Sequence, residues 1–411
     1  MKKLVALLLV SILLLAAVAP VFAEGKIEFW NDKLANTDAS ILGALSAALE
    51  ADSGIQVEIV SYPDVAAYQT ALQQSIKDAS APGMFTWWNG DQLNTLAKND
   101  LLVDLTDEWA NHYVPSGVSA DVAASLSYEG KTYAAPYTVL NNTVVYNKRA
   151  FAKAGIEAVP ATFDEFLADC EKLKAAGITP IALKNDSWAG FIWFQQMLAV
   201  YDIDLYTGVC DGSIPYTDGR IVAVMQSWRD MFDKGYFAPP VQSGDTAKTF
   251  ARDEVAMVLE PSLYLPTLVR EYGMVSGADF DAMVVPSATG EKNVVFFEVS
   301  PLAIPKATAD IEAAKKALRA FVMAGSQQIM ANDLGMPASS SAQIADPTIA
   351  KMVSFGNDPE HIRLVLRYYE STPAELRDVA LDELAKFIYS GAPIDEVLSA
   401  IQAKADAVFG K

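Results

Sequence analysis

Residues 26–62 read KIEFWNDKLANTDASILGALSAALEADSGIQVEIVSY, and this stretch predicts how the chain folds. A short apolar strand over 26–30 is followed by a helix over 39–52, because four apolar residues recur at helical spacing: Ile41, Leu42, Leu45 and Leu49. Gly54 ends the helix, and the strand over 55–62 alternates apolar with polar residues.

The same alternation continues along the chain. An amphipathic helix over 65–79 and a strand over 84–87 lead into a helix that begins near Asp91. Strands that alternate with helices predict βαβ units, in which a parallel sheet is covered by helices.

The middle of the chain predicts a second α/β lobe. Thr162-Phe163-Asp164-Glu165 is a capping box that opens a helix ending at Gly177. It is followed by expected strands over 178–183, 255–259 and 281–285, a helix over 219–232, and an almost wholly helical pattern from Ile311 onward. The expected fold is α/β with two lobes, each a helix-covered and mainly parallel sheet, joined by hinge crossings.

Length and charge limit the classes of function. The chain has 411 residues, of which 52% are hydrophobic, and this is enough for two packed cores. Its formal net charge of -20 disfavours nucleic acid and anionic lipid surfaces as partners. Solubility alone accounts for such a charge.

The N-terminus has the pattern of a secretory signal peptide. Lys2 and Lys3 precede an apolar run from Leu4 to Leu15, and small residues lead to an expected cleavage site after Ala23. An uncleaved membrane anchor is the alternative, but the run is shorter than the ~20 residues that span a bilayer. Because no Cys follows the site, we expect a soluble periplasmic protein without a lipid anchor.

Metal and cofactor chemistry is not expected. Cys170 and Cys210 are the only cysteines, and His112 and His361 the only histidines, so no zinc spacing occurs. The two cysteines either pair in an oxidising compartment or pack unpaired. The chain has no Gly-x-Ser-x-Gly elbow and no phosphate-binding glycine loop.

Several motifs occur in an order that resembles one known family. They are EGKIEFWNDK at 24–33, GIQV at 54–57, APGMFTWW at 81–88, LLVDLT at 101–106, GKTYAAPY at 130–137, VYNK at 145–148, PATFDE at 160–165, FARDEVAM at 250–257 and AIPK at 303–306. Together they resemble the extracellular solute-binding proteins of ABC importers, a family that includes the maltose-binding protein and the multiple-sugar and oligosaccharide binders.

The resemblance implies a periplasmic-binding-protein architecture and a function. Such a protein captures a carbohydrate between its lobes, closes by a hinge motion and delivers the sugar to an ABC permease in the membrane; it is monomeric and not an enzyme. We expect a first lobe of 24–137 plus about 288–337 and a second of about 138–287 plus about 338–411. Turn-forming or extended stretches at 136–141, 286–291 and 337–341 are the candidate crossings.

Two departures from the family pattern change the expected pocket. The family follows its Ala-Met with a Gly and a Trp that stacks on sugar, whereas this chain has Glu260-Pro261-Ser262-Leu263-Tyr264. A Gly-rich stretch is replaced by Phe296-Phe297-Glu298-Val299-Ser300.

A sugar site needs flat aromatic rings for the C–H faces and side chains with several hydrogen-bonding atoms for the hydroxyls. Strand ends facing the crevice of an α/β sheet are where such groups are expected. The candidates in the first lobe are Trp30, Asn31, Asp32, Tyr62, Trp87, Trp88, Asn89 and Asp91. Those associated with the second lobe are Tyr137, Asn142, Asp186, Trp188, Glu260, Tyr264 and Glu298.

The same residue types have ordinary structural roles. Each Trp can belong to the core, and each Asp or Asn can cap a helix. Because successive strand residues point to opposite faces, Trp87 and Trp88 are not both expected in the cleft, and we favour Trp88 as the one that contacts ligand.

Two other functions use the same site. A secreted glycoside hydrolase needs only two carboxylates and similar aromatic platforms. A sensor that presents its liganded form to a chemoreceptor has the same pocket as an importer subunit. The identity of the ligand is open between neutral sugars, amino sugars and polyamines, while the few Arg at the predicted strand ends disfavour phosphorylated sugars.

Overall fold

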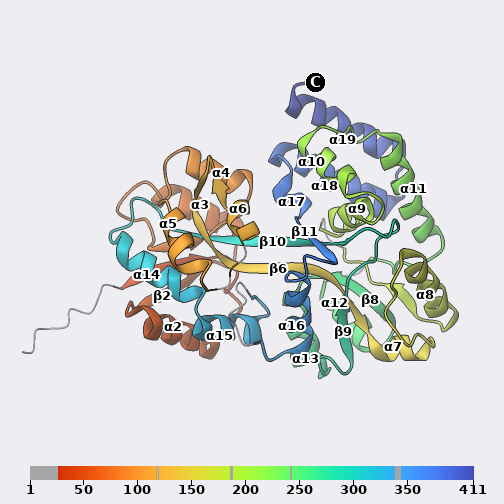
Figure 1. Cartoon of the computed structure of the whole chain (residues 1–411), viewed down its shortest axis with the longest axis horizontal. Helices are drawn as coiled ribbons and strands as arrows, with labels where there is room; N and C mark the ends of the chain where they lie inside the picture. Colours follow the sequence, from red (N-terminus) through yellow and green to blue (C-terminus); the bar gives the residue numbers. More distant parts are fainter. Residues whose placement is uncertain (1–25, 117, 119, 186–187, 241–242, 338–343) are drawn as a thin grey trace, which may run out of the picture.

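Two lobes lie side by side and are joined by long strands (Figure 1). The computed structural model describes residues 26–116, 118, 120–185, 188–240, 243–337 and 344–411. The expected signal peptide and Asp186 therefore lie outside the described residues. The architecture is the predicted two-lobed α/β fold.

The first lobe contains the N-terminal elements and two later helices. Its elements are β1 (Ile27–Asn31), α2 (Ala39–Ser53), β2 (Val57–Ser61), α3 (Val65–Ser75), β3 (Met84–Thr86), α4 (Asp91–Lys98), α5 (Thr106–Glu108), a π-helical turn (Trp109–Tyr113), α6 (Ala120–Ser125), β4 (Ser127–Tyr128), β5 (Lys131–Thr132), α14 (Ile311–Phe321) and α15 (Ala324–Leu334).

The second lobe contains the middle of the chain and its C-terminal part. Its elements are α7 (Lys148–Lys153), α8 (Phe163–Ala175), β7 (Thr179–Ile181), α9 (Trp188–Tyr201), α10 (Ile203–Asp211), α11 (Gly219–Asp233), α12 (Ser243–Ala251), β8 (Val255–Glu260), a 3-10 turn (Ser262–Tyr264), α13 (Leu265–Tyr272), β9 (Phe280–Met283), α16 (Pro347–Phe355), β11 (Ile362–Leu366), α17 (Tyr368–Ser371), α18 (Ala374–Ser390) and α19 (Ile394–Phe409).

The first lobe opens with the predicted βαβ units. β1 pairs in parallel with β2 and with β3, and Ile27 lies opposite Val57. Helix α2 ends at Gly54, whose φ of 73° is the left-handed value that glycine adopts without a steric cost. The capping box of α8 is also confirmed, since the Thr162 hydroxyl accepts a hydrogen bond from the Glu165 N–H at 3.2 Å.

Two long strands, β6 (Ala134–Asn147) and β10 (Asn293–Ala303), run through both lobes (Figure 1). They pair antiparallel along most of their length, with Glu298 opposite Leu140. The register shifts between Ser300 and Pro301, where Pro301 faces Pro136. Proline lacks an N–H and normally excludes a central strand, and this explains why the sequence pattern did not predict these two strands.

The lobes share one curled sheet instead of having a separate sheet each. Its strands follow the order β2-β1-β3-β10-β6-β8-β7, with β11 added to β10 and β9 added to β6. The expected parallel pairs occur in β1–β2, β1–β3, β7–β8 and β10–β11, whereas the centre is antiparallel. β11 also interrupts the C-terminal region that we expected to be almost wholly helical.

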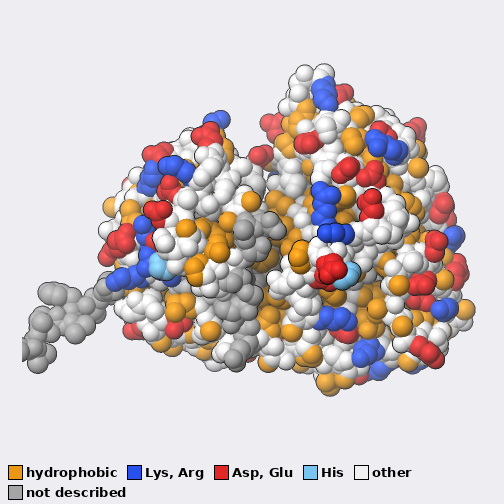
Figure 2. All heavy atoms as spheres, viewed as in Figure 1, with side chains coloured by type: hydrophobic (Ala, Val, Ile, Leu, Met, Phe, Trp, Pro, Cys, Tyr) orange, Lys and Arg blue, Asp and Glu red, His pale blue; other side chains and the backbone are white. Residues whose placement is uncertain are grey.

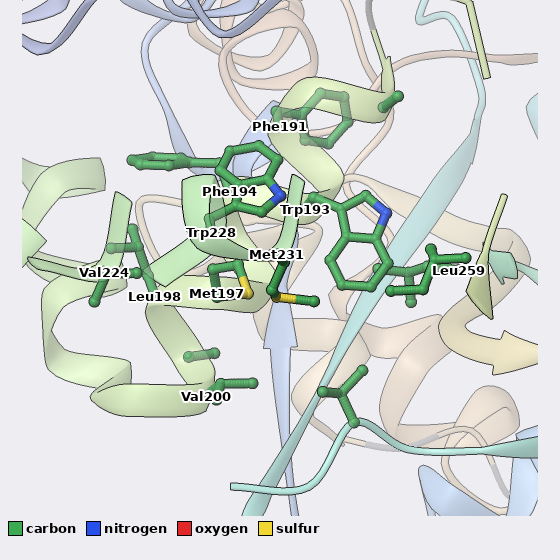
Figure 3. Close-up of a cluster of buried hydrophobic side chains, with 14 of the residues drawn as sticks. Phe191, Trp193, Phe194, Met197, Leu198, Val200, Val224, Trp228, Met231 and Leu259 are labelled. Carbon is green, nitrogen blue, oxygen red and sulfur yellow. The ribbon is translucent and has the colours of Figure 1, made fainter. Parts of the chain in front are cut away.

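Each lobe has its own hydrophobic core. The first core includes Tyr137 on β6 and Phe297 on β10, while the second includes Val144 and Phe296 on the same two strands. Figure 3 shows part of the second core, where α9 packs on α11 around Trp228. The change of core along β6 and β10 shows that the chain passes between the lobes there; the exact lobe boundaries stay a prediction.

Both cysteines are buried and unpaired, Cys170 in α8 and Cys210 in α10. Burial raises the pKa of the Cys210 thiol to about 12. Within the described residues, no helix has both the length and the apolar character required to span a bilayer.

Candidate functional site

A cavity of about 300 Å³ lies between the two lobes, where Figure 2 shows the surface hollowed. Both lobes contribute to its lining. The first lobe supplies Asp32, Lys33, Val65, Gln69, Trp87, Trp88 and Asn89, and Trp188, Arg367, Tyr369 and Glu370 belong to the second. Glu298, Val299 and Ser300 of the crossing strand β10 complete it.

The first-lobe wall is a group of aromatic rings that follows β3. Trp87 is buried at 7% exposure and belongs to the first core, whereas Trp88 is half-buried beside it. The two rings meet edge to face, with centroids 5.0 Å apart and planes at 70°. Trp88 also lies tilted against Tyr68, at 6.1 Å. Trp88 is half-buried and lines the cavity, so part of its ring is open to a ligand.

Polar groups stand next to these rings. The Thr86 hydroxyl donates a hydrogen bond to Asp32 Oδ1 at 2.9 Å and so fixes that carboxylate. Asn89 Oδ1 accepts from the Gly90 N–H at 2.7 Å, while Asn89 Nδ2 and Trp87 Nε1 are buried without a described partner. Buried donors are normally paired, and these two are covered by neighbouring side chains in this arrangement. An entering ligand that shifts those side chains can supply the missing acceptors.

Arg367 is the centre of the second-lobe wall. Its Nε and Nη2 donate to both carboxylate oxygens of Glu370 at 2.8 and 2.7 Å, and its Nη1 pairs with Glu298. The guanidinium also lies 5.0 Å from the ring of Trp188, which stacks on Tyr369 with centroids 4.8 Å apart. This bidentate geometry and the cation–π contact hold the arginine in one orientation.

Lys33 brings a second positive charge from the first lobe. Burial lowers the pKa of its ammonium, and nearby Arg367 also lowers it, whereas Asp32 and Glu370 raise it. The cavity thus contains three carboxylates, of Asp32, Glu298 and Glu370, and two cations. Arg367 is paired with Glu298 and Glu370, and the charges of Asp32 and Glu370 act on Lys33.

The structure brings many of the predicted site residues together. Asp32, Trp87, Trp88, Asn89, Trp188 and Glu298 line the interlobe cavity. Asn142 and Glu260 line a second cavity that shares Trp188 and Glu298 with the first. The sequence pattern did not indicate that the predicted residues line two adjacent cavities.

Other predicted residues do not line either cavity. Tyr137 is fully buried in the first core, and burial raises the pKa of its hydroxyl well above the usual value. Asn31 is also fully buried, and its Oδ1 accepts from the Leu34 N–H at 2.9 Å, so it stabilises the turn after β1. Tyr264 packs in a small third core beside Phe250. These three side chains pack inside the protein and line neither cavity.

Three more predicted residues lie near the cavity without lining it. Trp30 and Tyr62 contact each other with ring centroids 5.4 Å apart, and Trp30 Nε1 donates to Glu28 at 2.7 Å. Asp91 begins α4, and its Oδ2 accepts from the Ala374 N–H of the second lobe at 3.3 Å. Asp91 therefore contacts the opposite lobe.

Sequence reasoning missed Lys33, Arg367, Tyr369 and Glu370, which are three of the five charged side chains and one of the four aromatic rings in the described lining of the cavity. Arg367 lies between β11 and α17, and Tyr369 and Glu370 lie within α17. That stretch lies in a region read as helical, and no motif marked it. Among the described residues, no group of three or more His, Cys, Asp or Glu side chains is placed to hold a metal ion.

Comparison with known proteins gives partial sequence matches. The chain is 34% identical over 125 residues to the diacetylchitobiose binding protein DasA of Streptomyces coelicolor, covering 30% of this chain and 29% of that protein. It is 28% identical over 214 residues to a probable sugar-binding periplasmic protein of Rhizobium meliloti, covering 50% of each. The chain thus spans less than two thirds of the length of these curated relatives.

Solved structures match over nearly the whole chain. A chitin oligosaccharide binding protein has a TM-score of 0.78 at 18% identity, covering 94% of this chain and 99% of that one. The bacterial solute receptor AcbH has a TM-score of 0.75 at 19% identity, covering 94% and 99%. At such identities the likeness shows the shared two-lobed fold.

The family itself is shown by a match to its sequence model. Residues 44–357, well over half of the chain, match the model of the bacterial extracellular solute-binding proteins. The aromatic and polar cavity between two lobes is where a protein of this fold holds a small molecule. The chain belongs to the bacterial extracellular solute-binding protein family.

Proposed function

We propose that this protein captures a neutral carbohydrate between its lobes and delivers it to an ABC permease. The observation that carries the proposal is the interlobe cavity, where both lobes present aromatic rings beside carboxylate, amide and hydroxyl groups. Trp88 offers a flat face from the first lobe, and the Trp188–Tyr369 stack lies on the second. This combination suits a sugar ring, which has apolar C–H faces and hydroxyls around its edge.

The relatives support the same class of ligand. DasA is named for diacetylchitobiose, and the Rhizobium meliloti relative is named a probable sugar-binding protein. Structural neighbours include a chitin oligosaccharide binding protein and a solute binding protein solved with α-D-tagatose. These ligands differ in size and in sugar, so they support a carbohydrate without selecting one.

The charges in the cavity favour a ligand without a negative charge. A phosphorylated or acidic sugar needs an arginine or lysine with free donors. Arg367 already uses its guanidinium on Glu298 and Glu370, and Lys33 lies beside Asp32. A neutral sugar instead accepts hydrogen bonds from the amides and donates its hydroxyl protons to the carboxylates.

Closure of the lobes is part of the proposal. Gly90 has φ 71° and ψ -139°, and a Cβ at this position would lie 2.4 Å from the Glu370 carbonyl oxygen of the other lobe. Together with the Asp91–Ala374 hydrogen bond, this close approach forms a direct contact between α4 and the start of α18. The contact stabilises the closed arrangement, and a ligand adds to it by touching both walls.

A catalytic role is not proposed. A glycoside hydrolase uses two carboxylates, one as an acid and one as a base or nucleophile. In this cavity Glu298 and Glu370 are both bound to the same arginine, and Asp32 accepts from Thr86. These contacts indicate a binding role, and release of shorter sugars from an oligosaccharide by the purified protein would overturn it.

Export is proposed from the N-terminal residues. The family is extracellular, and cleavage after Ala23 would leave a soluble periplasmic monomer that meets the permease of an ABC importer. The net charge of -20 makes nucleic acid an unsuitable partner. Mass spectrometry of the secreted protein is expected to find Glu24 as its first residue, and an intact N-terminus would refute cleavage.

A thermal-shift screen tests which class of ligand the protein binds. Neutral mono- and oligosaccharides, uronic acids and polyamines are added separately to the purified protein, and the unfolding temperature is recorded. A ligand at 100 times its dissociation constant stabilises by about 2.7 kcal/mol, so a neutral sugar that binds is expected to raise the Tm by several degrees. If polyamines alone raise the Tm, the carbohydrate assignment is wrong.

Trp88 is predicted to be the first-lobe platform. Replacing it, W88A, removes a half-buried ring without a stacked partner, so we expect at least a tenfold loss of sugar affinity with little change in the Tm of the free protein. The neighbouring substitution W87A is the control, because it empties a core position and costs about 3–5 kcal/mol of stability. Calorimetric titration measures both affinities, and wild-type affinity in W88A would exclude Trp88 from the site.

Gly90 is predicted to control closure. An alanine there collides with the Glu370 carbonyl, so G90A is expected to weaken sugar binding at least tenfold. G130A is the matched control, because Gly130 also has a positive φ of 77° but no atom within 4 Å of an added Cβ. Both variants pay about 1–3 kcal/mol of backbone strain. Equal affinity in the two variants would show that the interlobe contact does not contribute to binding.

A further inference from the structure

A second cavity of about 230 Å³, here called the inner chamber, adjoins the interlobe cavity. It lies within the second lobe, between α9, β8 and the turn that follows β8. Most of its lining is apolar, including Ile192, Trp193, Leu259 and Leu263. Figure 3 shows the Trp193 ring turned toward Leu259 at the edge of the second core.

The inner chamber and the interlobe cavity share three lining residues. Trp188, Glu298 and Arg367 line both spaces and form their shared boundary. A ligand seated against Trp88 and Trp188 therefore lies next to this boundary, and a substituent on its near side is close to the chamber. The apolar walls of the chamber then select what that substituent is.

Few polar groups face a substituent there. Lys184 is paired with Glu260, and its ammonium lies 6.0 Å from the ring of Tyr264. Asn142 Nδ2 donates to the Phe296 carbonyl at 3.4 Å, which fixes the amide orientation and leaves Asn142 Oδ1 buried without a described partner. The charged side chains of the lining are paired with each other, Lys184 with Glu260 and Arg367 with Glu298, and Asn142 Oδ1 is an acceptor that has no described partner.

We propose that the inner chamber receives the N-acyl group of an N-acylated amino sugar, an inference that rests on the proposed carbohydrate function. An acetamido group combines an N–H donor for Asn142 Oδ1, a carbonyl acceptor for Lys184 and a methyl group for the apolar walls. The inference names a substrate class for the site: sugars whose amino groups carry a short acyl chain.

Related sugars lack this combination. A hydroxyl in the same place leaves the apolar walls without an apolar partner. A free ammonium adds a charge to a space whose lining carboxylates, Glu260 and Glu298, are already paired with Lys184 and Arg367. A charge in apolar surroundings is costly unless it has a partner of its own. An acyl group therefore matches both the apolar walls of the chamber and its polar groups, Lys184 and Asn142.

The test compares three β-1,4-linked disaccharides of the same ring configuration by calorimetric titration. They are N,N'-diacetylchitobiose, the corresponding free-amine disaccharide, and cellobiose. We expect the acetylated sugar to bind at least tenfold more tightly than either of the others. The full-length mature protein is used throughout.

Two matched variants locate the preference. Leu263 lines the chamber and is 43% exposed, while Val269, at 39% exposure, lies outside the lining of both cavities. Both positions tolerate a polar side chain without loss of the core, and the Tm of each variant verifies folding. L263Q is expected to reduce the preference for the acetylated sugar at least threefold, and V269Q to leave it unchanged.

The outcomes separate this inference from the proposed function. Equal binding of all three sugars, or tighter binding of the free amine, overturns the acyl assignment while sugar binding stands. An acetyl preference that L263Q does not alter also overturns it, because the acyl group then lies elsewhere. Failure of every sugar in this set and in the thermal screen overturns the inference together with the carbohydrate function.

Discussion

The antiparallel pairing of β6 with β10 is the constraint on which the rest of the molecule depends. Both strands leave one hydrophobic core and enter the other, so they connect the two lobes. The same strands place Asn142 and Glu298 at the two cavities. The position of the proposed binding site is thus a consequence of the crossing, and the closure that we propose is a motion about it.

Arg367 pairs with the carboxylates beside the crossing strands. Buried carboxylates need partners, and this one guanidinium satisfies Glu298 from the crossing strand and Glu370 from α17. The guanidinium also lies against the ring of Trp188, so the charged and aromatic side chains of the second lobe contact each other. Because Arg367 is already paired with two carboxylates, the cavity suits a neutral sugar better than an anion.

The sequence predicted the parts of the fold that depend on local patterns. The β1-α2-β2 unit and the α8 capping box follow from residue spacing, and alternation along the chain anticipated that Trp87 is more buried than Trp88. The crossing strands escaped prediction because Pro136 and Pro301 break the strand pattern, yet they sit opposite each other at an irregularity in the ladder.

The site was less predictable for a different reason. Aromatic and acidic residues near strand ends could be listed, but the pattern did not separate Tyr137, which packs in the core, from residues that reach the cavity. Arg367, Tyr369 and Glu370, at and just before α17, reach the other cavity residues only through long-range packing. No spacing along the chain therefore marked them.

The central claim, that a carbohydrate binds between the lobes, is tested most directly by a crystal structure of the protein with the sugar that gives the largest thermal shift. The account predicts a sugar ring between Trp88 and the Trp188–Tyr369 stack, with hydroxyls bonded to groups from both lobes. Sugar bound only on the outer surface of one lobe, with the interlobe cavity unchanged, would contradict it.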